Sequence, residues 1–158
     1  MKKLLLFMAV VALSFSANAQ NFSAGVSGGI PTGDFGDAYS FTILVEVSAL
    51  WDVSDVFDAG VTAGYSNTSL KSEFDGDSVG FLPIAAAARF NVSDAFSLEA
   101  DLGYAIGISP DGNDGGFYYA PKLLYGVTDS IDIVASYRGV SLDGSTFNTI
   151  TLGVDIGL

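Results

Sequence analysis

The sequence predicts an all-β fold: a single eight-stranded antiparallel up-and-down transmembrane β-barrel, preceded by a cleavable signal peptide. Three observations predict it: an apolar N-terminal segment behind two lysines, a turn motif that occurs three times, and long segments in which apolar and small polar residues alternate. The 158 residues suffice for one domain, so we expect residues 1–19 to be the signal peptide and residues 20–158 the barrel domain.

The composition favours strands over helices. Hydrophobic residues make up 49% of the chain, and its 19 glycines, 12 phenylalanines and seven tyrosines are typical of strands and tight turns. No apolar stretch approaches the roughly 18 to 20 residues that a membrane-spanning helix needs. A chain this apolar without such a helix is typical of a transmembrane barrel.

The N-terminal segment has the three parts of a secretory signal peptide. Lys2 and Lys3 precede the apolar run 4–13, and small residues lead up to Ala19. We therefore expect cleavage between Ala19 and Gln20. The alternative is an anchor helix that is retained, but these ten apolar residues are too few to span a bilayer.

Charge and missing residue types exclude several functions. Cleavage would leave four basic residues against 18 acidic ones, and this excludes nucleic acid as a partner, because binding it needs a basic surface. The chain has no His and no Cys, which excludes His-dependent catalysis, thiol nucleophiles, disulfides and imidazole or thiolate metal sites. The acidic segments 75–77 and 111–115 resemble calcium loops only loosely, so we expect no metal site. Together with the missing His and Cys residues, this predicts a protein without cofactor and without enzymatic activity.

A repeated turn motif, Val-Ser/Thr-Asp, predicts the number of strands. It occurs at 53–55, 92–94 and 127–129, and its side-chain oxygens favour tight turns. Four longer breaks rich in Gly, Asp and Ser separate the copies, at 31–40, 67–79, 109–116 and 141–146. Three short turns and four longer loops connect eight strands, which we expect near 22–30, 41–51, 57–66, 80–90, 96–108, 117–127, 131–140 and 147–158. Short periplasmic turns and long outer loops are the asymmetry of outer-membrane barrels.

Alternation within the strands predicts which face meets lipid. The last strand places Ile150, Leu152, Val154 and Ile156 on one face, opposite a face of Thr, Gly and Asp. A soluble or secreted β-domain would also alternate. However, its solvent face would display many Lys and Glu side chains, and here the polar face is mostly small. Small polar residues suit the narrow interior of an eight-stranded barrel. Two belts of outward aromatic residues are expected at the membrane interfaces.

Charged residues in the strands fall on the interior face. We expect them to form an ionic network that plugs the lumen, with Arg89 level with Glu99 and Lys122 level with Asp101. A gated or transient small pore is the alternative, and Glu99 with Asp101 could in principle act as an acid–base pair. Counter-ions in a packed interior explain these residues better. The predicted structural network comprises Glu46, Arg89, Glu99, Asp101, Lys122 and Arg138.

Two features fit the strands poorly. The run 85–88 has no periodicity, so the register of the fourth strand depends on Leu82, Ile84 and Phe90. Pro83 and Pro121 fall inside strands, where each removes a backbone donor, and we expect a bulge or a shifted strand end there.

With its three turns, the segment 137–145 and an alternating C-terminal strand, the chain resembles small outer-membrane barrels of the porin-family or OmpA/OmpX-like kind. The resemblance covers residues 20–158. It implies a bacterial outer-membrane location, a structural, envelope or surface-interaction role and, as the alternative, a narrow porin-like diffusion channel. Implied partners are outer-membrane lipid, lipopolysaccharide and the barrel-assembly machinery acting on the C-terminal strand. The barrel itself is expected to be a monomer. Family members commonly end in an aromatic residue, and here Leu158 stands in that place.

Overall fold

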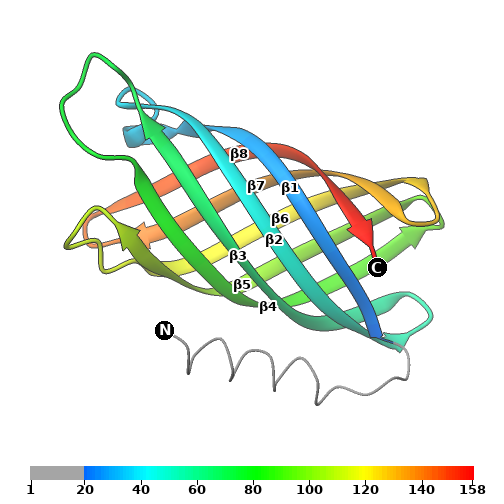
Figure 1. The fold of residues 1–158 in the computed structure, drawn as a ribbon. Coiled ribbons are helices and arrows are strands. Elements are labelled where there is room, and N and C mark those ends of the chain that lie inside the picture. The colour runs from blue at the N-terminus through cyan, green and yellow to red at the C-terminus, as the bar shows by residue number, and fades with distance from the viewer. Residues whose placement is uncertain (1–19) are drawn as a thin grey trace.

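Residues 20–158, which the computed structural model describes, form one closed antiparallel β-barrel (Figure 1). The expected signal peptide and Ala19 of the expected cleavage site lie outside these residues. The predicted fold of eight antiparallel strands is confirmed. The strands are β1 (Gln20–Thr32), β2 (Tyr39–Ser54), β3 (Phe57–Leu70), β4 (Val79–Ser93), β5 (Phe96–Ser109), β6 (Gly116–Thr128), β7 (Ile131–Leu142) and β8 (Ser145–Gly157), with a 3-10 turn η1 (Gly33–Phe35) between β1 and β2.

The first and last strands close the barrel. Each strand pairs with its neighbours in sequence, and β1 also pairs with β8 in antiparallel register. Residues that lie opposite each other on neighbouring strands, followed once around the barrel, lead from Phe22 back to β1 at Thr32, a stagger of ten residues. Such a stagger means that the strands are steeply tilted, and eight strands enclose an interior narrow enough for side chains to fill.

The three copies of the turn motif form the same structure. After β2, β4 and β6 the chain turns through two residues, and each turn is preceded by a shift in the pairing register. The residue left out of the pairing is the valine of each motif, Val53, Val92 or Val127. Each turn also accepts a backbone hydrogen bond from the strand that follows its hairpin. In the first turn, Asn91 N–H of β4 donates to Val56 O at 2.8 Å. Each copy of the motif therefore forms a bulge and a tight turn, which together set the pairing register of the two strands they connect, at the short-turn end of the barrel.

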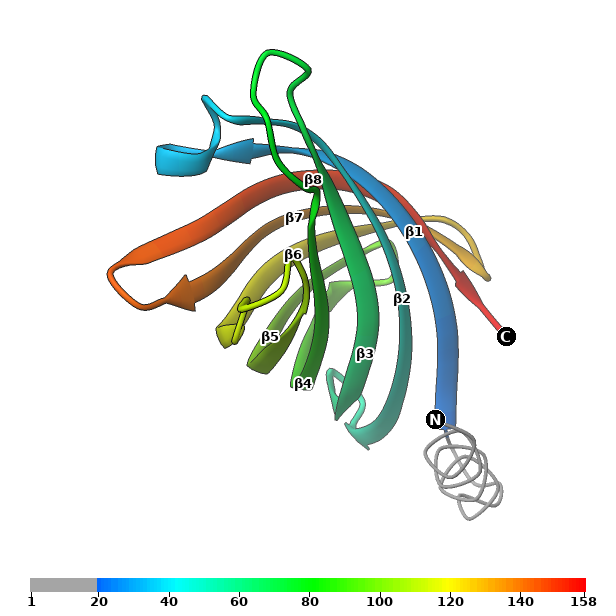
Figure 2. The same cartoon turned by 60° about the vertical axis from the view of Figure 1, so that its left-hand side comes forward.

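The opposite end carries the longer connections, with one exception. Residues 33–38, 71–78 and 110–115 join β1–β2, β3–β4 and β5–β6, and the β3–β4 loop projects farthest beyond the barrel rim (Figures 1 and 2). The expected fourth loop is wrong, because β7 and β8 extend to Leu142 and Ser145 and leave only Asp143–Gly144 between them. Gly144 adopts φ +81, which suits a two-residue hairpin turn.

Each of the eight strands of residues 20–158 exposes large apolar side chains on the outside of the barrel. Leu152 is 63% exposed on the bare barrel, whereas the neighbouring Thr151 is 2% exposed. In β4 the alanine run follows the register set by Ile84 and Phe90, so that Ala85 and Ala87 point inward.

The expected bulge is not found at Pro121, whereas near Pro83 the ladder between β4 and β5 shifts register between Gly80 and Phe81. In the ladder to β3, partners on both sides of Pro83 keep one register, and only the pairs at this point are missing. Pro121 likewise leaves a gap toward β7 without a shift. Each proline keeps its pairing with β5, and this ladder holds the strand in place where the other is interrupted.

Candidate functional site: the barrel interior

The interior of the barrel holds a buried ionic network centred on Lys122 of β6. The Lys122 Nζ lies 2.6 Å from Glu46 Oε1, 2.9 Å from Glu99 Oε1 and 2.7 Å from Asp101 Oδ2. These three carboxylates come from β2 and β5, so one ammonium group connects opposite walls of the barrel.

Two arginines extend the network on either side of Lys122. Arg138 Nη1 lies 2.8 Å from Glu46 Oε2 and also donates to the Tyr118 hydroxyl. Arg89 Nε lies 2.6 Å from Glu99 Oε2. The structure thus places all six residues predicted for the network inside the barrel and brings them together. Arg89 is level with Glu99 as predicted, but the expected level of Lys122 is wrong, because its cross-strand partner is Glu99 and it reaches Asp101 diagonally.

One further acid, Asp155 of β8, belongs to the network and was missed by the sequence analysis. Its Oδ2 lies 4.0 Å from Arg89 Nη2 and accepts a hydrogen bond from Ser23 Oγ at 2.6 Å. The signal was present, since Asp155 lies on the polar face of the alternating last strand. Its inclusion gives the network three basic groups and four carboxylates.

Asp101 is the least satisfied member of the network. The residue is 0% exposed, and its Oδ2 receives Lys122 and a 3.2 Å hydrogen bond from the Thr62 hydroxyl. Its Oδ1 is the one buried side-chain nitrogen or oxygen of residues 20–158 that has no hydrogen-bond partner. Removing Lys122 would therefore leave Asp101 with a single hydroxyl donor.

The half of the interior toward the longer loops has the expected small polar lining only in part, where the buried hydroxyls of Thr42 and Thr68 hydrogen-bond at 2.8 Å. An aromatic plug fills the rest, formed by the buried Phe81, Tyr118, Val140 and Phe147 with Val79, Ala85, Ala105 and Ala120. The Phe147 ring centroid lies 5.6 Å from that of Phe81 and 5.5 Å from that of Tyr39. The alternation predicted the direction of these side chains but not that large ones could be stacked near one mouth.

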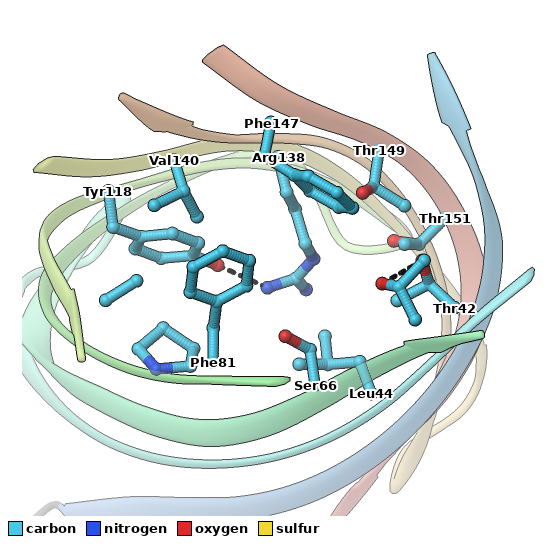
Figure 3. Close-up of a pocket in the computed structure, with 13 residues that line it drawn as sticks. Thr42, Leu44, Ser66, Phe81, Tyr118, Arg138, Val140, Phe147, Thr149 and Thr151 are labelled. Atoms are coloured by element: carbon cyan, nitrogen blue, oxygen red, sulfur yellow. Dashed lines mark hydrogen bonds between the residues drawn. The ribbon is translucent and has the colours of Figure 1, made fainter. Parts of the chain in front are cut away.

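Only small spaces remain between the plug and the network. A cavity of about 30 Å³ lies between Phe81, Phe147 and Arg138 (Figure 3), and a second of about 20 Å³ lies beside Arg89 and Lys122. Each has room for no more than a few water molecules. Wider spaces lie at the two ends of the barrel, about 320 Å³ at the short-turn mouth and about 600 Å³ beside Asp77 and Pro110 at the longer loops. Between these ends the interior is therefore filled by side chains.

This arrangement suits stabilisation rather than catalysis. Glu99 and Asp101, the pair considered for acid–base work, are both held by Lys122, and Glu99 also by Arg89. Within residues 20–158 no group of three or more acidic side chains is arranged to hold a metal ion. In the same residues, no helix has the length and apolar character to cross a membrane.

Comparison with known proteins identifies the fold. The family described as "Outer membrane protein beta-barrel domain" matches residues 4–156. No curated protein sequence matches the chain.

Solved structures match over nearly the whole chain. A designed transmembrane β-barrel aligns with a TM-score of 0.60 at 15% identity, covering 91% of this chain and 100% of its own. Ail, the attachment invasion locus protein of Yersinia pestis, aligns with a TM-score of 0.57 at 18% identity, covering 88% and 97%. Neisserial surface protein A aligns with a TM-score of 0.53 at 15% identity, covering 91% and 100%. At these identities the similarity establishes the barrel fold.

Proposed function

Because the chain belongs to the outer membrane protein β-barrel family and is a protein of the bacterial outer membrane, we propose that it is a non-enzymatic barrel with an envelope or surface-interaction role. Its interior is filled by side chains, and its longer loops face the outside of the cell and are free to contact partners. The observation that carries this proposal is the filled lumen, in which the ionic network and the aromatic plug leave cavities of only about 30 and 20 Å³.

Transport measurements separate this role from a narrow porin-like diffusion channel. The purified barrel, reconstituted in liposomes, should give no solute-dependent swelling, and in planar bilayers no steady conductance. An open porin reconstituted in parallel serves as the positive control. A steady conductance would overturn the proposal in favour of the channel.

The charge of the loops restricts their partners. The loops at the long-loop end carry eight acidic residues, and Lys71 is the only basic residue of 20–158 outside the strands. Ail has been crystallised in complex with the heparin analogue sucrose octasulfate. The acidic loops of this chain would repel such a polyanion. We expect no retention of the barrel on heparin at low salt, and retention would contradict this charge argument.

Lipid contacts belong to the same proposal. The apolar outer face would lie against outer-membrane lipid, and lipopolysaccharide phosphates would reach the acidic loops through bridging divalent ions. The barrel-assembly machinery would engage β8, and the folded protein would be a monomer without affinity for nucleic acid. Electrophoresis of unheated and boiled outer membranes tests insertion, because a folded barrel migrates differently from its boiled form.

The proposal includes export by the N-terminal segment. Residues 1–19 act as the signal peptide and are removed between Ala19 and Gln20, which places the new N-terminus at the first residue of β1. N-terminal sequencing of the protein isolated from outer membranes should begin at Gln20. A sequence that begins at Met1 would instead support the retained anchor.

A further inference from the structure

The β1–β2 loop packs on the aromatic plug at the long-loop mouth of the barrel. Its η1 turn carries Phe35, whose ring centroid lies 4.9 Å from that of Phe147 and 6.2 Å from that of Tyr39. Phe35 is only partly buried and packs on the plug from outside, while η1 lies against β8. Phe35 is thus the outermost layer of the interior packing.

This loop lies outside the β1–β2 ladder. Pairing between β1 and β2 ends at Gly29 and Thr42, so the intervening residues are not held together by hydrogen bonds between these two strands. Beyond that point β1 pairs with β8, and β2 pairs with β3. The segment 33–38 could therefore lift away without breaking the ladder that closes the barrel.

Lys71 provides the polar attachment of the loop. Its Nζ donates to the backbone carbonyls of Asp37 at 2.8 Å and Gly36 at 3.2 Å, directly after η1. Its backbone N–H donates to Ala38 O at 3.0 Å. The Lys71 ammonium group therefore attaches the backbone that follows η1 to the start of the β3–β4 loop.

We propose that residues 33–38 are a lid over the lumen and that Lys71 is its latch. With the lid closed, Phe35 seals the plug and excludes solvent from the cavity beneath, which is lined by Thr149 and floored by Arg138 (Figure 3). With the lid open, Phe147 loses the ring that packs on it from the loop side, the aromatic plug loosens, and water and small reagents enter this cavity. The ionic network below still blocks passage, so opening gives access without a pore.

A single introduced cysteine tests the lid, because the chain has no cysteine of its own. Thr149→Cys places a near-isosteric thiol in the cavity wall, where Thr149 is buried. The folded barrel in vesicles, with its loops outward, is treated with a small charged methanethiosulfonate that cannot cross lipid, and the labelling rate is measured. Thr149→Cys is combined with Lys71→Met, Phe35→Ala or the conservative Lys71→Arg, which retains donors for both carbonyls. Unheated electrophoresis confirms that each variant is folded.

The lid predicts slow labelling of Thr149→Cys alone. Lys71→Met and Phe35→Ala should each accelerate it at least about tenfold, equivalent to about 1.4 kcal/mol of lid closure. Lys71→Arg should leave the rate nearly unchanged. Unaltered rates in both Lys71→Met and Phe35→Ala would overturn the proposal, as would equal acceleration by Lys71→Arg. Conductance should stay absent in every variant, so this test can fail without affecting the proposed role of the barrel.

Discussion

Removing the central cation of the lumen is the perturbation that the structure resolves best. Lys122→Met deletes an ammonium group that contacts three carboxylates, while a side chain of similar length remains. Two of these acids keep another cation: Glu46 keeps Arg138 at 2.8 Å, and Glu99 keeps Arg89 at 2.6 Å. Asp101 keeps only the Thr62 hydroxyl at 3.2 Å.

The loss of stability should therefore reflect one carboxylate left without a cation, that of Asp101, rather than three. Breaking a buried ion pair by removing one partner typically costs about 3 to 5 kcal/mol, because the remaining charge is left uncompensated. We expect Lys122→Met to lower the free energy of unfolding by about this amount. Arg89→Met should cost less, since Glu99 retains Lys122 at 2.9 Å.

Urea unfolding of the barrel in lipid vesicles measures this difference. Trp51, the only tryptophan of the chain, reports insertion by its fluorescence, and unheated electrophoresis reports the folded fraction. Lys122→Met combined with Asp101→Asn should recover at least half of the loss, because the stranded charge is then removed as well.

Two results would refute this reasoning. A loss below about 1 kcal/mol for Lys122→Met would show that the network is accessible to water, as surface pairs are. A double variant less stable than Lys122→Met would show that Asp101 is not the stranded group.

Three further predictions concern individual positions and use the same unfolding assay. Asp101→Asn alone should cost less than half of Lys122→Met, because Lys122 retains two carboxylates; an equal cost would contradict this. Gly103→Ala should destabilise the barrel by about 1 to 3 kcal/mol by overpacking, because the added Cβ would lie 2.1 Å from Ile84 O. Gly126→Ala is the matched control and should cost clearly less, because the atom nearest to its added Cβ is 3.4 Å away. Gly144→Ala should cost about 1 kcal/mol, because Gly144 has φ +81 and nothing within 4 Å, and no loss would mean that the turn can adopt another conformation.

Local patterns predicted the elements of this fold. Alternation fixes the direction of each side chain in a strand, which is why Leu152 and Asp101 were assigned to the correct faces. The valine motif predicted three identical turns because its chemistry is local. Turn length at the other end was less predictable, since pairing of β7 with β8 extends through a polar segment as far as Leu142 and Ser145.

Contacts across the lumen could be predicted only in part. Arg89 and Glu99 lie on neighbouring strands, so counting from the turn between them sufficed. Glu46 meets Lys122 and Arg138 across the barrel, at a level that depends on strand tilt and on the ten-residue stagger around the whole sheet. The stacking of Phe35 on Phe147 depends in addition on the path of a loop.

Depth-dependent fluorescence quenching along β8 tests the central claim, that the apolar face meets hydrocarbon and the polar face is enclosed. Single cysteines at Ile150, Thr151, Leu152, Gly153 and Val154 are labelled with a small fluorophore before folding into vesicles of brominated lipid. Strong quenching should alternate with a period of two, at Ile150, Leu152 and Val154 but not at Thr151 or Gly153. Equal quenching at all five positions, or quenching at Thr151 and Gly153 alone, would contradict the account.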